Sequence, residues 1–333
     1  MARPTLTARV FSRRSLLRDA AIVAGGTSVL PGCDVLKLPD EETLDEWPPI
    51  TDNETFYITN YAGVREVDAA TWTLKFLDRG ELLAEIDLAY LESLPGRDKE
   101  HTLQCIGSSQ GNQAIGNAIW TGLPLPELLA GLGVTLRADA LQVKFTGDDG
   151  YETSLPRETI DKPMWLVWKM NGVPLPKSHG FPARMLVPGR YGTKNPKWLT
   201  ALELIDEPFI GFWEALNWSD SAIYRPNTFV RQPQDRATVV GPAVIIGTAF
   251  AGEDEILRVE YSSDDGATWQ PAEITYQNGP SIWTLWRFDF DEESGDYSII
   301  VRCTTHSGAQ SMIGGTGNLS GYNGSMAIDV TLL

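Results

Sequence analysis

Basic side chains alternate with glycine and proline in the segment His179-Gly-Phe-Pro-Ala-Arg-Met-Leu-Val-Pro-Gly-Arg-Tyr-Gly-Thr-Lys-Asn-Pro-Lys-Trp198. It lies in a window, residues 162–202, with seven Lys and Arg and no Asp or Glu, although the 333-residue chain has 44 acidic residues. Glycine lets a backbone approach a ligand closely, and arginine can hold a phosphate through two hydrogen bonds. A solvated loop would explain the polarity but not the missing acids, so the window predicts a bound anion.

A single cysteine, Cys105, ends a predicted strand in His101-Thr-Leu-Gln-Cys-Ile-Gly107. A lone cysteine is more often a small buried hydrophobe than a reactive group. No CxxC and no His-rich spacing accompanies it, which argues against structural zinc, and the chain has neither a P-loop nor a dinucleotide-binding Gly-x-Gly-x-x-Gly. Taken alone, the residues leave the role of Cys105 open. His101 is expected at the surface, His306 in a turn, and Cys303 as a buried structural cysteine.

The first 33 residues are predicted to be an export signal. An arginine pair in Ser12-Arg13-Arg14-Ser15-Leu16-Leu17 precedes an apolar run at residues 20–30 that is too short to span a bilayer. This pattern resembles a twin-arginine signal, and Val29-Leu-Pro-Gly-Cys33 resembles a bacterial lipobox in which Cys33 is lipidated. The alternative is a chance cysteine in a leader. We expect a lipoprotein anchored to a membrane, facing the periplasm or cell exterior, with residues 34–52 as a tether.

Net charge and cysteine content limit the classes of molecule that the chain is expected to bind and the source of its stability. Removal of residues 1–32 would move the formal charge from −17 to about −21. Such a chain is not expected to bind nucleic acid but could be steered toward a basic protein such as a small cytochrome. Twin-arginine export carries folded cargo, which predicts a cofactor. With Cys33 lipidated only two cysteines would remain, so stability must come from hydrophobic cores.

Two regions of different character follow the tether. Residues 53–225 mix strand and helix patterns without the regular alternation of a doubly wound sheet, which predicts an α+β domain. Its elements are expected as a half-buried strand through Trp72, Leu74 and Phe76, helices at 88–94 and 126–132, and a buried strand at 164–168.

Residues 226–333 carry only strand and turn signals. Strands are expected at 239–246, 257–261, 297–302 and 326–332, with a hairpin turn at Ser263-Asp-Asp-Gly266. Short strands without helix patterns predict an immunoglobulin-like sandwich.

Together these motifs resemble the sulfite oxidase family of molybdenum enzymes. Thr102-Leu-Gln-Cys105-Ile-Gly107 resembles its metal-ligand segment, and Met170-Asn-Gly172 with residues 175–198 resembles its pterin-binding segment. Arg258-Val-Glu-Tyr-Ser-Ser-Asp-Asp-Gly-Ala-Thr-Trp269, with Trp283–Trp286 and Arg302, resembles its C-terminal dimerisation domain. The resemblance covers residues 53–333, with the motifs in the family's order.

The resemblance implies a molybdenum–molybdopterin enzyme that transfers an oxygen atom at a small sulfur- or nitrogen-containing substrate. Cys105 would be the thiolate ligand of molybdenum. The resemblance assigns cofactor binding to Asn60, Tyr61, His179, Arg184, Gly192, Lys194 and Lys197. The chain has no CxxCH haem motif, so a separate cytochrome or membrane haem protein would exchange the electrons. The sandwich implies a homodimer.

The chain also departs from the family. Sulfite oxidases carry arginines where this chain has Thr59 and Ser108-Ser109-Gln110, and usually histidine where it has Tyr61. Ser and Gln cannot replace the charge of arginine, so we expect sulfite to be a poor substrate unless Arg190 or an arginine of the sandwich compensates. Two alternatives stay open: an activity like methionine sulfoxide reductase, whose branch usually lacks the sandwich, and a catalytically idle scaffold lipoprotein. The retained Cys105 and basic segment argue against the scaffold.

Overall fold

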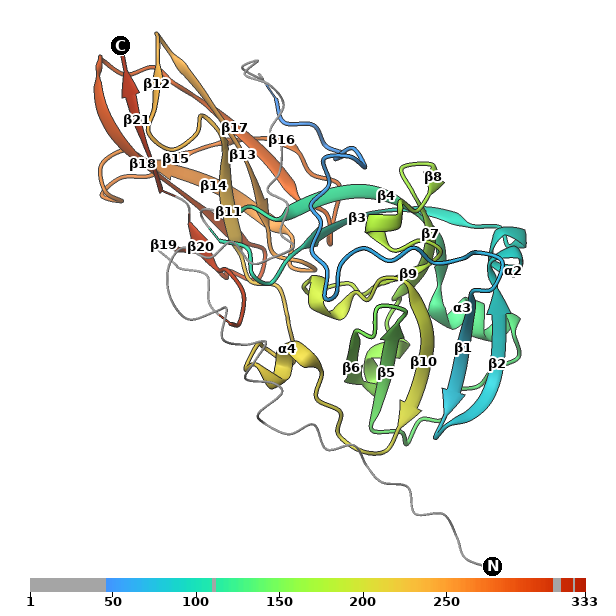
Figure 1. Ribbon diagram of the computed structural model, residues 1–333. Helices are drawn as coiled ribbons and strands as arrows, with labels where there is room; N and C mark the ends of the chain where they lie inside the picture. Colours follow the sequence, from blue (N-terminus) through green and yellow to red (C-terminus); the bar gives the residue numbers. More distant parts are fainter. Residues whose placement is uncertain (1–45, 110–111, 314–318, 326) are drawn as a thin grey trace, which may run out of the picture.

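The computed structural model describes residues 46–109, 112–313, 319–325 and 327–333. The predicted signal, lipobox and most of the tether lie outside these residues. Two sheets form the N-terminal part and two form the C-terminal part (Figure 1). Within the described residues, no helix has the length and apolar character needed to cross a bilayer.

The first N-terminal sheet has the strand order β2-β1-β10-β5-β6. Its strands are β1 (Thr73–Asp78), β2 (Glu81–Asp87), β5 (Gln142–Gly147), β6 (Glu152–Pro156) and β10 (Leu199–Ile205). All pairings are antiparallel except β1 with β10. Trp72, Leu74 and Phe76 are all buried, as the alternation predicts, and pack in one core with residues of β5 and β10.

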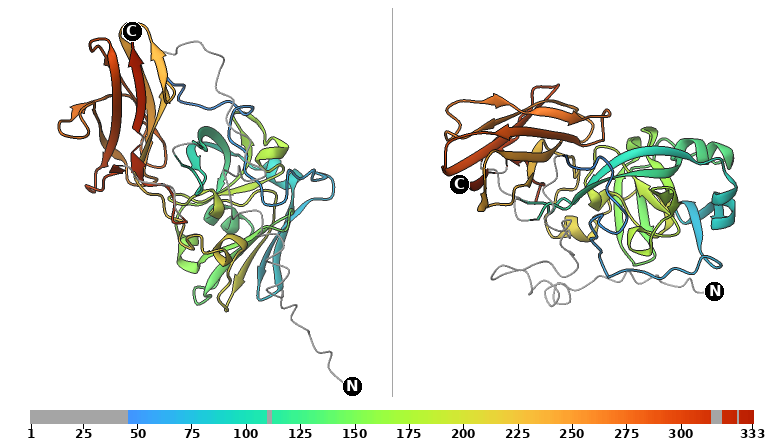
Figure 2. Two further views of the ribbon diagram at one scale, coloured as in Figure 1. Left: turned by 60° about the vertical axis from the view of Figure 1, so that its left-hand side comes forward. Right: turned by 90° about the horizontal axis from the view of Figure 1, so that it is seen from above.

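The second N-terminal sheet has the order β3-β4-β7-β8, and β9 pairs with β7. These strands are β3 (Arg97–Gln104), β4 (Ile115–Pro124), β7 (Trp165–Met170), β8 (Val173–Pro174) and β9 (Arg184–Leu186). In Figures 1 and 2 the β3–β4 hairpin, in teal, extends from the N-terminal part to the C-terminal sheets. The hairpin therefore belongs to the junction between the two parts.

Helices are few and short. The α-helices are α2 (Leu88–Ser93), α3 (Leu125–Gly131) and α4 (Phe212–Ala215), and the 3₁₀ turns are η1 (Arg157–Asp161), η2 (Lys177–His179) and η3 (Gly192–Lys194). The Asp87 side chain accepts a hydrogen bond from the backbone N–H of Tyr90 at the start of α2, which satisfies one donor left open at a helix start. Helices α2 and α3 lie where the sequence predicts them, within one residue.

The C-terminal part contains strands only, within the residues described after α4. One sheet has the order β16-β17-β13-β11-β20-β19 and the other β12-β21-β18-β14-β15. Their bounds are β11 (Asn227–Gln232), β12 (Ala237–Val239), β13 (Ala243–Phe250), β14 (Ile256–Ser262), β15 (Gln270–Pro271), β16 (Glu273–Tyr276), β17 (Thr284–Phe290), β18 (Gly295–Thr305), β19 (Met312–Ile313), β20 (Gly324–Ser325) and β21 (Ala327–Leu332). Buried residues of both sheets form one core.

One predicted strand has different limits. The expected strand at 239–246 is two elements, because Val239 ends β12 and β13 begins only at Ala243. Gly241, with φ +74°, and Pro242 lie between them. A left-handed residue followed by proline interrupts an extended strand, so the apolar run does not form one element. Cys303 is buried in β18 and His306 lies in an exposed turn, as predicted.

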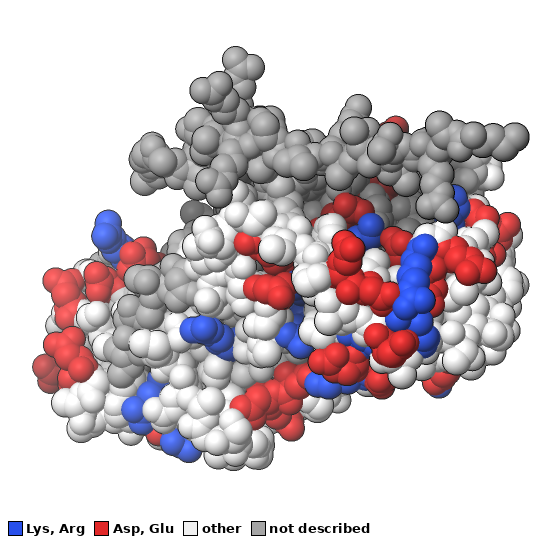
Figure 3. All heavy atoms as spheres, turned by 90° about the horizontal axis from the view of Figure 1, so that it is seen from below, with Lys and Arg blue, Asp and Glu red and all other residues white. Residues whose placement is uncertain are grey.

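The surface reflects the acidic composition. On the face in Figure 3, acidic side chains are spread over the molecule and basic side chains are scattered among them without forming one patch. Within the acid-free window Arg184 and Lys194 are buried, whereas Lys162 and Lys177 are exposed.

Candidate active site

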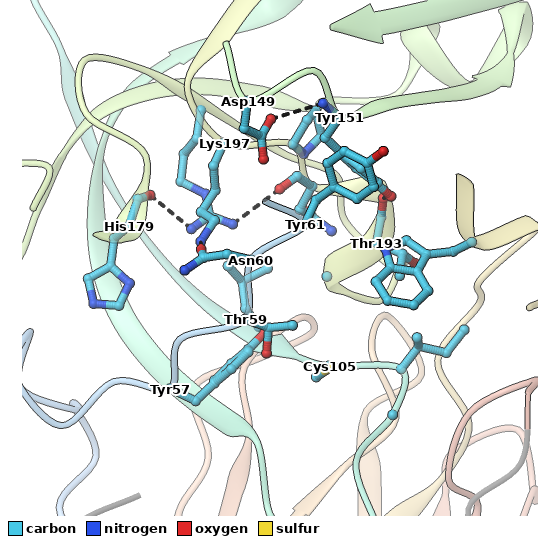
Figure 4. Close-up of a pocket in the computed structure, with 18 of the residues that line it drawn as sticks. Tyr57, Thr59, Asn60, Tyr61, Cys105, Asp149, Tyr151, His179, Thr193 and Lys197 are labelled. Carbon is cyan, nitrogen blue, oxygen red and sulfur yellow. Dashed lines mark hydrogen bonds between the residues drawn. The ribbon is translucent and has the colours of Figure 1, made fainter. Parts of the chain in front are cut away.

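A cleft of about 890 Å³, its open mouth included, lies at the end of β3 (Figure 4). Its lining residues belong to segments 56–61, 103–107, 149–151, 179–198 and 213–218. Seven of the eight predicted cofactor residues line it: Asn60, Tyr61, Cys105, His179, Arg184, Gly192 and Lys197.

The position of Cys105 is fixed by the strand before it. The backbone N–H of Cys105 donates to Ala114 O at 2.9 Å, which continues the β3–β4 pairing past the end of β3. Alternate residues of β3 bond to the C-terminal part: Glu100 accepts from Tyr276 Oη at 2.7 Å, and the amides of Gln104 and Asn227 exchange two hydrogen bonds of 3.1 Å. One face of β3 thus docks on the sandwich, and Cys105 follows it, partly exposed to the cleft.

Basic side chains line the opposite side of the cleft. Arg184 donates to the backbone oxygens of His179 and Asn195 at 3.1 and 3.2 Å, and its guanidinium lies 5.2 Å from the ring centre of Trp120. Lys197 Nζ donates to Asn60 Oδ1 and, at 2.9 Å, to Ser178 O. Figure 4 shows His179 and Lys197 together on one side, away from Tyr61 and Tyr151.

Burial disfavours the charged forms of Arg184 and Lys197 unless an anion lies beside them. It lowers the pKa of Arg184 to about 10 and that of Lys197 well below its usual range, and repulsion from Arg184 lowers the Lys197 pKa further. Burial also lowers the pKa of His179 to about 4, and Arg184 and Lys197 add to the effect, so this imidazole is neutral near pH 7. Asp149 is the one acidic residue among the described lining residues, and burial raises its pKa.

These groups fit a bound anionic cofactor with a thiolate-ligated metal. The Nε–H of Arg184 is buried and has no hydrogen-bond partner. A buried donor normally has an acceptor, so this N–H is available to a ligand atom bound on the cationic side of the cleft. Cys105 offers a soft ligand. No group of three or more His, Cys, Asp or Glu suited to a metal occurs among the described residues, so a metal at Cys105 would take its other ligands from the cofactor.

Two glycines allow the close packing of the site. Gly180 has φ +110°, and a β-carbon there would lie 3.0 Å from Lys197 Cβ and 3.2 Å from Arg184 Cβ. A β-carbon at Gly192 would lie 3.3 Å from Tyr57 Oη and 4.0 Å from Cys105 Cα. Glycine at these positions lets the basic segment approach both its own cations and the end of β3.

Lys194 lies apart from the predicted group. Its side chain is fully buried, and Nζ donates to Glu214 Oε1 at 2.5 Å, Ser154 O at 3.0 Å and Asp220 Oδ1 at 3.2 Å. A lysine held by two carboxylates has no free charge for a phosphate. The structure therefore does not support direct phosphate binding by Lys194; its neighbour Thr193 lines the cleft instead.

Two other expectations are corrected. His101 is fully buried, not at the surface: it lies within β3, which pairs with β4, and Trp120 of β4 donates its indole N–H to the His101 backbone oxygen at 3.0 Å. Arg190 lies outside the described cleft lining: it lines a second cavity with Lys162 and Glu253, and Nη1 donates to Ser221 O. No described lining residue comes from beyond Trp218, so the described lining holds no arginine of the C-terminal sheets.

Sequence reasoning missed several lining residues. Tyr151 donates its hydroxyl to Thr193 O at 2.6 Å, and Trp213 and Trp218 also line the cleft. The signal available for them was the density of aromatic residues in Phe212-Trp-Glu-Ala-Leu-Asn-Trp218, directly after the acid-free window.

Comparisons with known proteins agree with this geometry. Residues 61–213 match the oxidoreductase molybdopterin binding domain, and residues 216–309 match the Mo-co oxidoreductase dimerisation domain. Mitochondrial sulfite oxidase of Rattus norvegicus is 30% identical over 296 residues, which are 75% of this chain and 54% of that protein. Nitrate reductase [NADH] 1 of Arabidopsis thaliana is 24% identical over 305 residues, 73% of this chain and 33% of that protein.

A solved structure has the same fold. The sulfane dehydrogenase SoxCD from Paracoccus pantotrophus superposes with a TM-score of 0.74 at 22% identity, covering 90% of this chain and 88% of that chain. The chain spans about half the length of the mammalian relatives it matches. The two domains matched in succession, together with the thiol and basic side chains in one cleft, identify the family. The chain belongs to the molybdopterin-dependent oxidoreductases of the sulfite oxidase family.

Proposed function

We propose that this protein is a molybdenum–molybdopterin oxidoreductase that transfers an oxygen atom at a small sulfur- or nitrogen-containing substrate. One observation carries the proposal: the Cys105 thiol and the unpartnered, buried Arg184 Nε–H line the same cleft. The relatives named sulfite oxidase and nitrate reductase bear names of sulfur and nitrogen chemistry, which supports the class of substrate. A separate one-electron carrier would exchange the electrons.

The residues divide the work between two sides of the cleft. Cys105 would bind molybdenum, while Arg184, Lys197 and Asn60, with His179, would hold the pterin and its phosphate. When bound, the cofactor supplies oxygen-atom transfer coupled to two electrons. Asp149, whose pKa is raised by burial, is placed to carry a proton to or from the cleft at its carboxylate.

Sulfite fits this cleft poorly. The cations in the described lining are Arg184 and Lys197, and both donate to protein oxygens. Thr59 offers a hydroxyl where a compact dianion needs a guanidinium. We therefore expect a neutral or weakly charged sulfur or nitrogen centre. Sulfite turnover at a micromolar Michaelis constant would contradict this.

The remaining organisation belongs to the same proposal. We take residues 53–225 as the catalytic domain and 226–333 as an immunoglobulin-like dimerisation domain. The shared core of the two C-terminal sheets and the dimerisation-domain match support this division. Residues 1–33 would direct twin-arginine export and Cys33 would carry the lipid, leaving the protein on the outer side of a membrane.

Molybdenum content tests the proposal. Exported full-length protein is assayed for molybdenum by elemental analysis and for pterin by fluorescence, beside Cys105→Ser and the control Cys303→Ala, whose thiol is buried in β18. We expect stoichiometric molybdenum in the wild type and the control, and loss of metal or of the oxidised-centre absorption in Cys105→Ser. A folded wild type with neither metal nor pterin would instead support the idle scaffold.

A second candidate, an activity like methionine sulfoxide reductase, is favoured by Thr59 and by the absence of other cations from the described lining. The β-sandwich-type second part argues against it. Turnover of protein-bound methionine sulfoxide at a higher kcat/KM than that of any free sulfoxide would favour this second candidate.

A further inference from the structure

Five aromatic side chains form a continuous row along one side of the cleft. We call this row the aromatic arc: Tyr151, Tyr61, Phe212, Trp213 and Trp218. Successive ring centres are 5.8, 4.8, 5.1 and 6.1 Å apart, with tilted or edge-to-face geometry at each step. All except Phe212 line the cleft. Such spacing is typical of favourable ring–ring contacts, so the rings support one another.

One end of the arc, Trp218, lies near the Cys105 thiol. A β-carbon added at Gly107 would lie 3.5 Å from the Trp218 ring and 3.8 Å from Cys105 Sγ. The ring and the sulfur therefore both lie beside Gly107. In Figure 4, Tyr61 and Tyr151 lie across the cleft from His179, so the arc and the cationic side face one another.

The arc is held in place from behind. Tyr151 donates its hydroxyl to Thr193 O at 2.6 Å. Trp213 lies on α4, and the next residue, Glu214, is bound to buried Lys194. Tyr61, the second ring of the row, is 41% exposed, whereas Tyr151 at the end of the row is buried. The arc thus forms an apolar wall of the cleft that is held by contacts behind it.

Such a wall selects an organic group. Aromatic faces bind apolar bodies through burial and dispersion, whereas an inorganic oxyanion would lose its hydration there without gaining a cation. Lys197 lies on the other side in Figure 4, and both Arg184 and Lys197 donate to protein oxygens. The arc is therefore placed to hold the part of a substrate that does not react.

We propose that the aromatic arc is the substrate subsite, and that the substrate is a neutral organic sulfoxide or the matching thioether whose apolar substituent packs on Trp213 and Trp218. This inference rests on the proposed function. In the reducing direction the S–O bond breaks, two electrons from a one-electron carrier and two protons are taken up, and the oxygen leaves as water. In the oxidising direction water supplies the oxygen and the same electrons and protons are released.

Binding of an inert probe tests the arc without turnover. Methyl phenyl sulfone is titrated by calorimetry into the molybdenum-loaded full-length protein, beside Trp218→Leu, Trp213→Leu and the control Trp269→Phe. Trp269 stacks on Arg302 and lies outside the described lining. We expect Kd to rise about tenfold in each leucine variant, an amount typical of losing an aromatic contact, and to stay unchanged in the control. Leucine fills much of the space of the tryptophan side chain that it replaces. Because two variants are tested separately, the test still stands if one of them fails to fold.

Kinetics give a second readout. With a dye as electron donor, Trp218→Leu should raise the ratio of KM for methyl phenyl sulfoxide to KM for dimethyl sulfoxide about tenfold, because dimethyl sulfoxide has little apolar surface to pack on the ring, whereas the control Trp269→Phe should change neither KM nor kcat. Equal changes for both sulfoxides, sulfone binding insensitive to both tryptophans, or a preference for sulfite or trimethylamine N-oxide would overturn the inference. A folded, exported wild type that holds no molybdenum but binds the sulfone with the same dependence on Trp213 and Trp218 would show a binding site without the enzyme. That result would refute the proposed function rather than the subsite.

Discussion

Lys194 Nζ lies 2.5 Å from Glu214 Oε1, and the two side chains are 0% and 5% exposed. This ion pair joins η3, in the basic segment, to α4, which carries Trp213. Thr153 Oγ also donates to Glu214 Oε1, at 3.2 Å, and contacts Lys194 Nζ at 3.1 Å. A residue expected to bind phosphate thus connects the two sides of the cleft.

Removal of one partner of this pair should be strongly destabilising. In Lys194→Met the Glu214 carboxylate stays buried without its cation, and we expect the free energy of unfolding to fall by about 3–5 kcal/mol. The double variant Lys194→Met/Glu214→Leu should recover most of this loss. Urea unfolding of the wild type, both single variants and the double variant measures the coupling. Additive losses in the double variant would show that the pair is not a unit.

His101 should make stability depend on pH. Burial, with Lys99 and Arg184 nearby, lowers its pKa from 6.5 to about 3. Between these values the unfolded chain binds the proton and the folded chain does not, so stability falls as the pH falls from about 6.5 toward 3. The contribution is at most about 1.4 kcal/mol per pH unit.

Urea midpoints between pH 7 and pH 5 check this contribution. His101→Leu should flatten the pH dependence, whatever its effect at pH 7, while His306→Gln, in an exposed turn, should leave it unchanged. His179, whose pKa is lowered to about 4, contributes with the same sign and remains in both variants. Parallel curves for His101→Leu and the wild type would contradict the prediction.

Arg231 is a buried cation whose replacement should increase stability. It is 2% exposed, its Nε and Nη2 have no hydrogen-bond partner, and its guanidinium lies 5.1 and 5.9 Å from the ring centres of Trp47 and Trp283. Stacking is worth about 2 kcal/mol, less than the several kcal/mol that burial of an unpaired ion costs. We expect Arg231→Met to raise the free energy of unfolding by about 1–2 kcal/mol.

The matched control for that change is Arg258→Met, because Arg258 is exposed and pairs with Glu260 at 3.1 Å. Its effect should stay within about 0.5 kcal/mol. Thermal or urea unfolding of the two variants decides the question. A clear loss of stability in Arg231→Met would show that the contacts with both tryptophans outweigh the burial of charge.

The sandwich should make the protein a homodimer. An isologous contact requires only one self-complementary face, and residues 216–309 match a dimerisation domain. Light scattering on residues 34–333, prepared without the cysteine proposed to carry lipid, should give twice the mass of one chain at micromolar concentration. A mass of one chain across that range would refute the dimer.

The sequence predicted an element correctly where the burial of its side chains follows from the pattern of apolar and polar residues within that element. Trp72, Leu74 and Phe76 alternate with polar residues and form one buried face of the first sheet. Cys303 sits in an apolar strand and is buried there. The acid-free window likewise predicted where Arg184 and Lys197 converge, because excess charge of one sign needs a partner of the other.

The failures have a common physical cause. His101 was expected at the surface, yet it is buried, because β3 pairs with β4 and its residues Glu100 and Gln104 bond to the C-terminal sheets. Lys194 is indistinguishable by type from Lys197, but its carboxylate partners, Glu214 and Asp220, lie beyond the window. Sequence spacing shows which charges are present, whereas the direction of each side chain depends on contacts far along the chain.

The docking of β3 on the C-terminal sheets limits how such proteins can be recombined. Glu100 and Gln104 bond to Tyr276 and Asn227, and these contacts set the strand that presents Cys105. A chimera that took its second half from a relative without the matching partners would leave the buried Gln104 amide and the half-buried Glu100 carboxylate without these bonds, close to the proposed metal ligand Cys105. The two halves are therefore expected to be inherited as one unit, and a hybrid enzyme would need this small polar set transplanted with the domain.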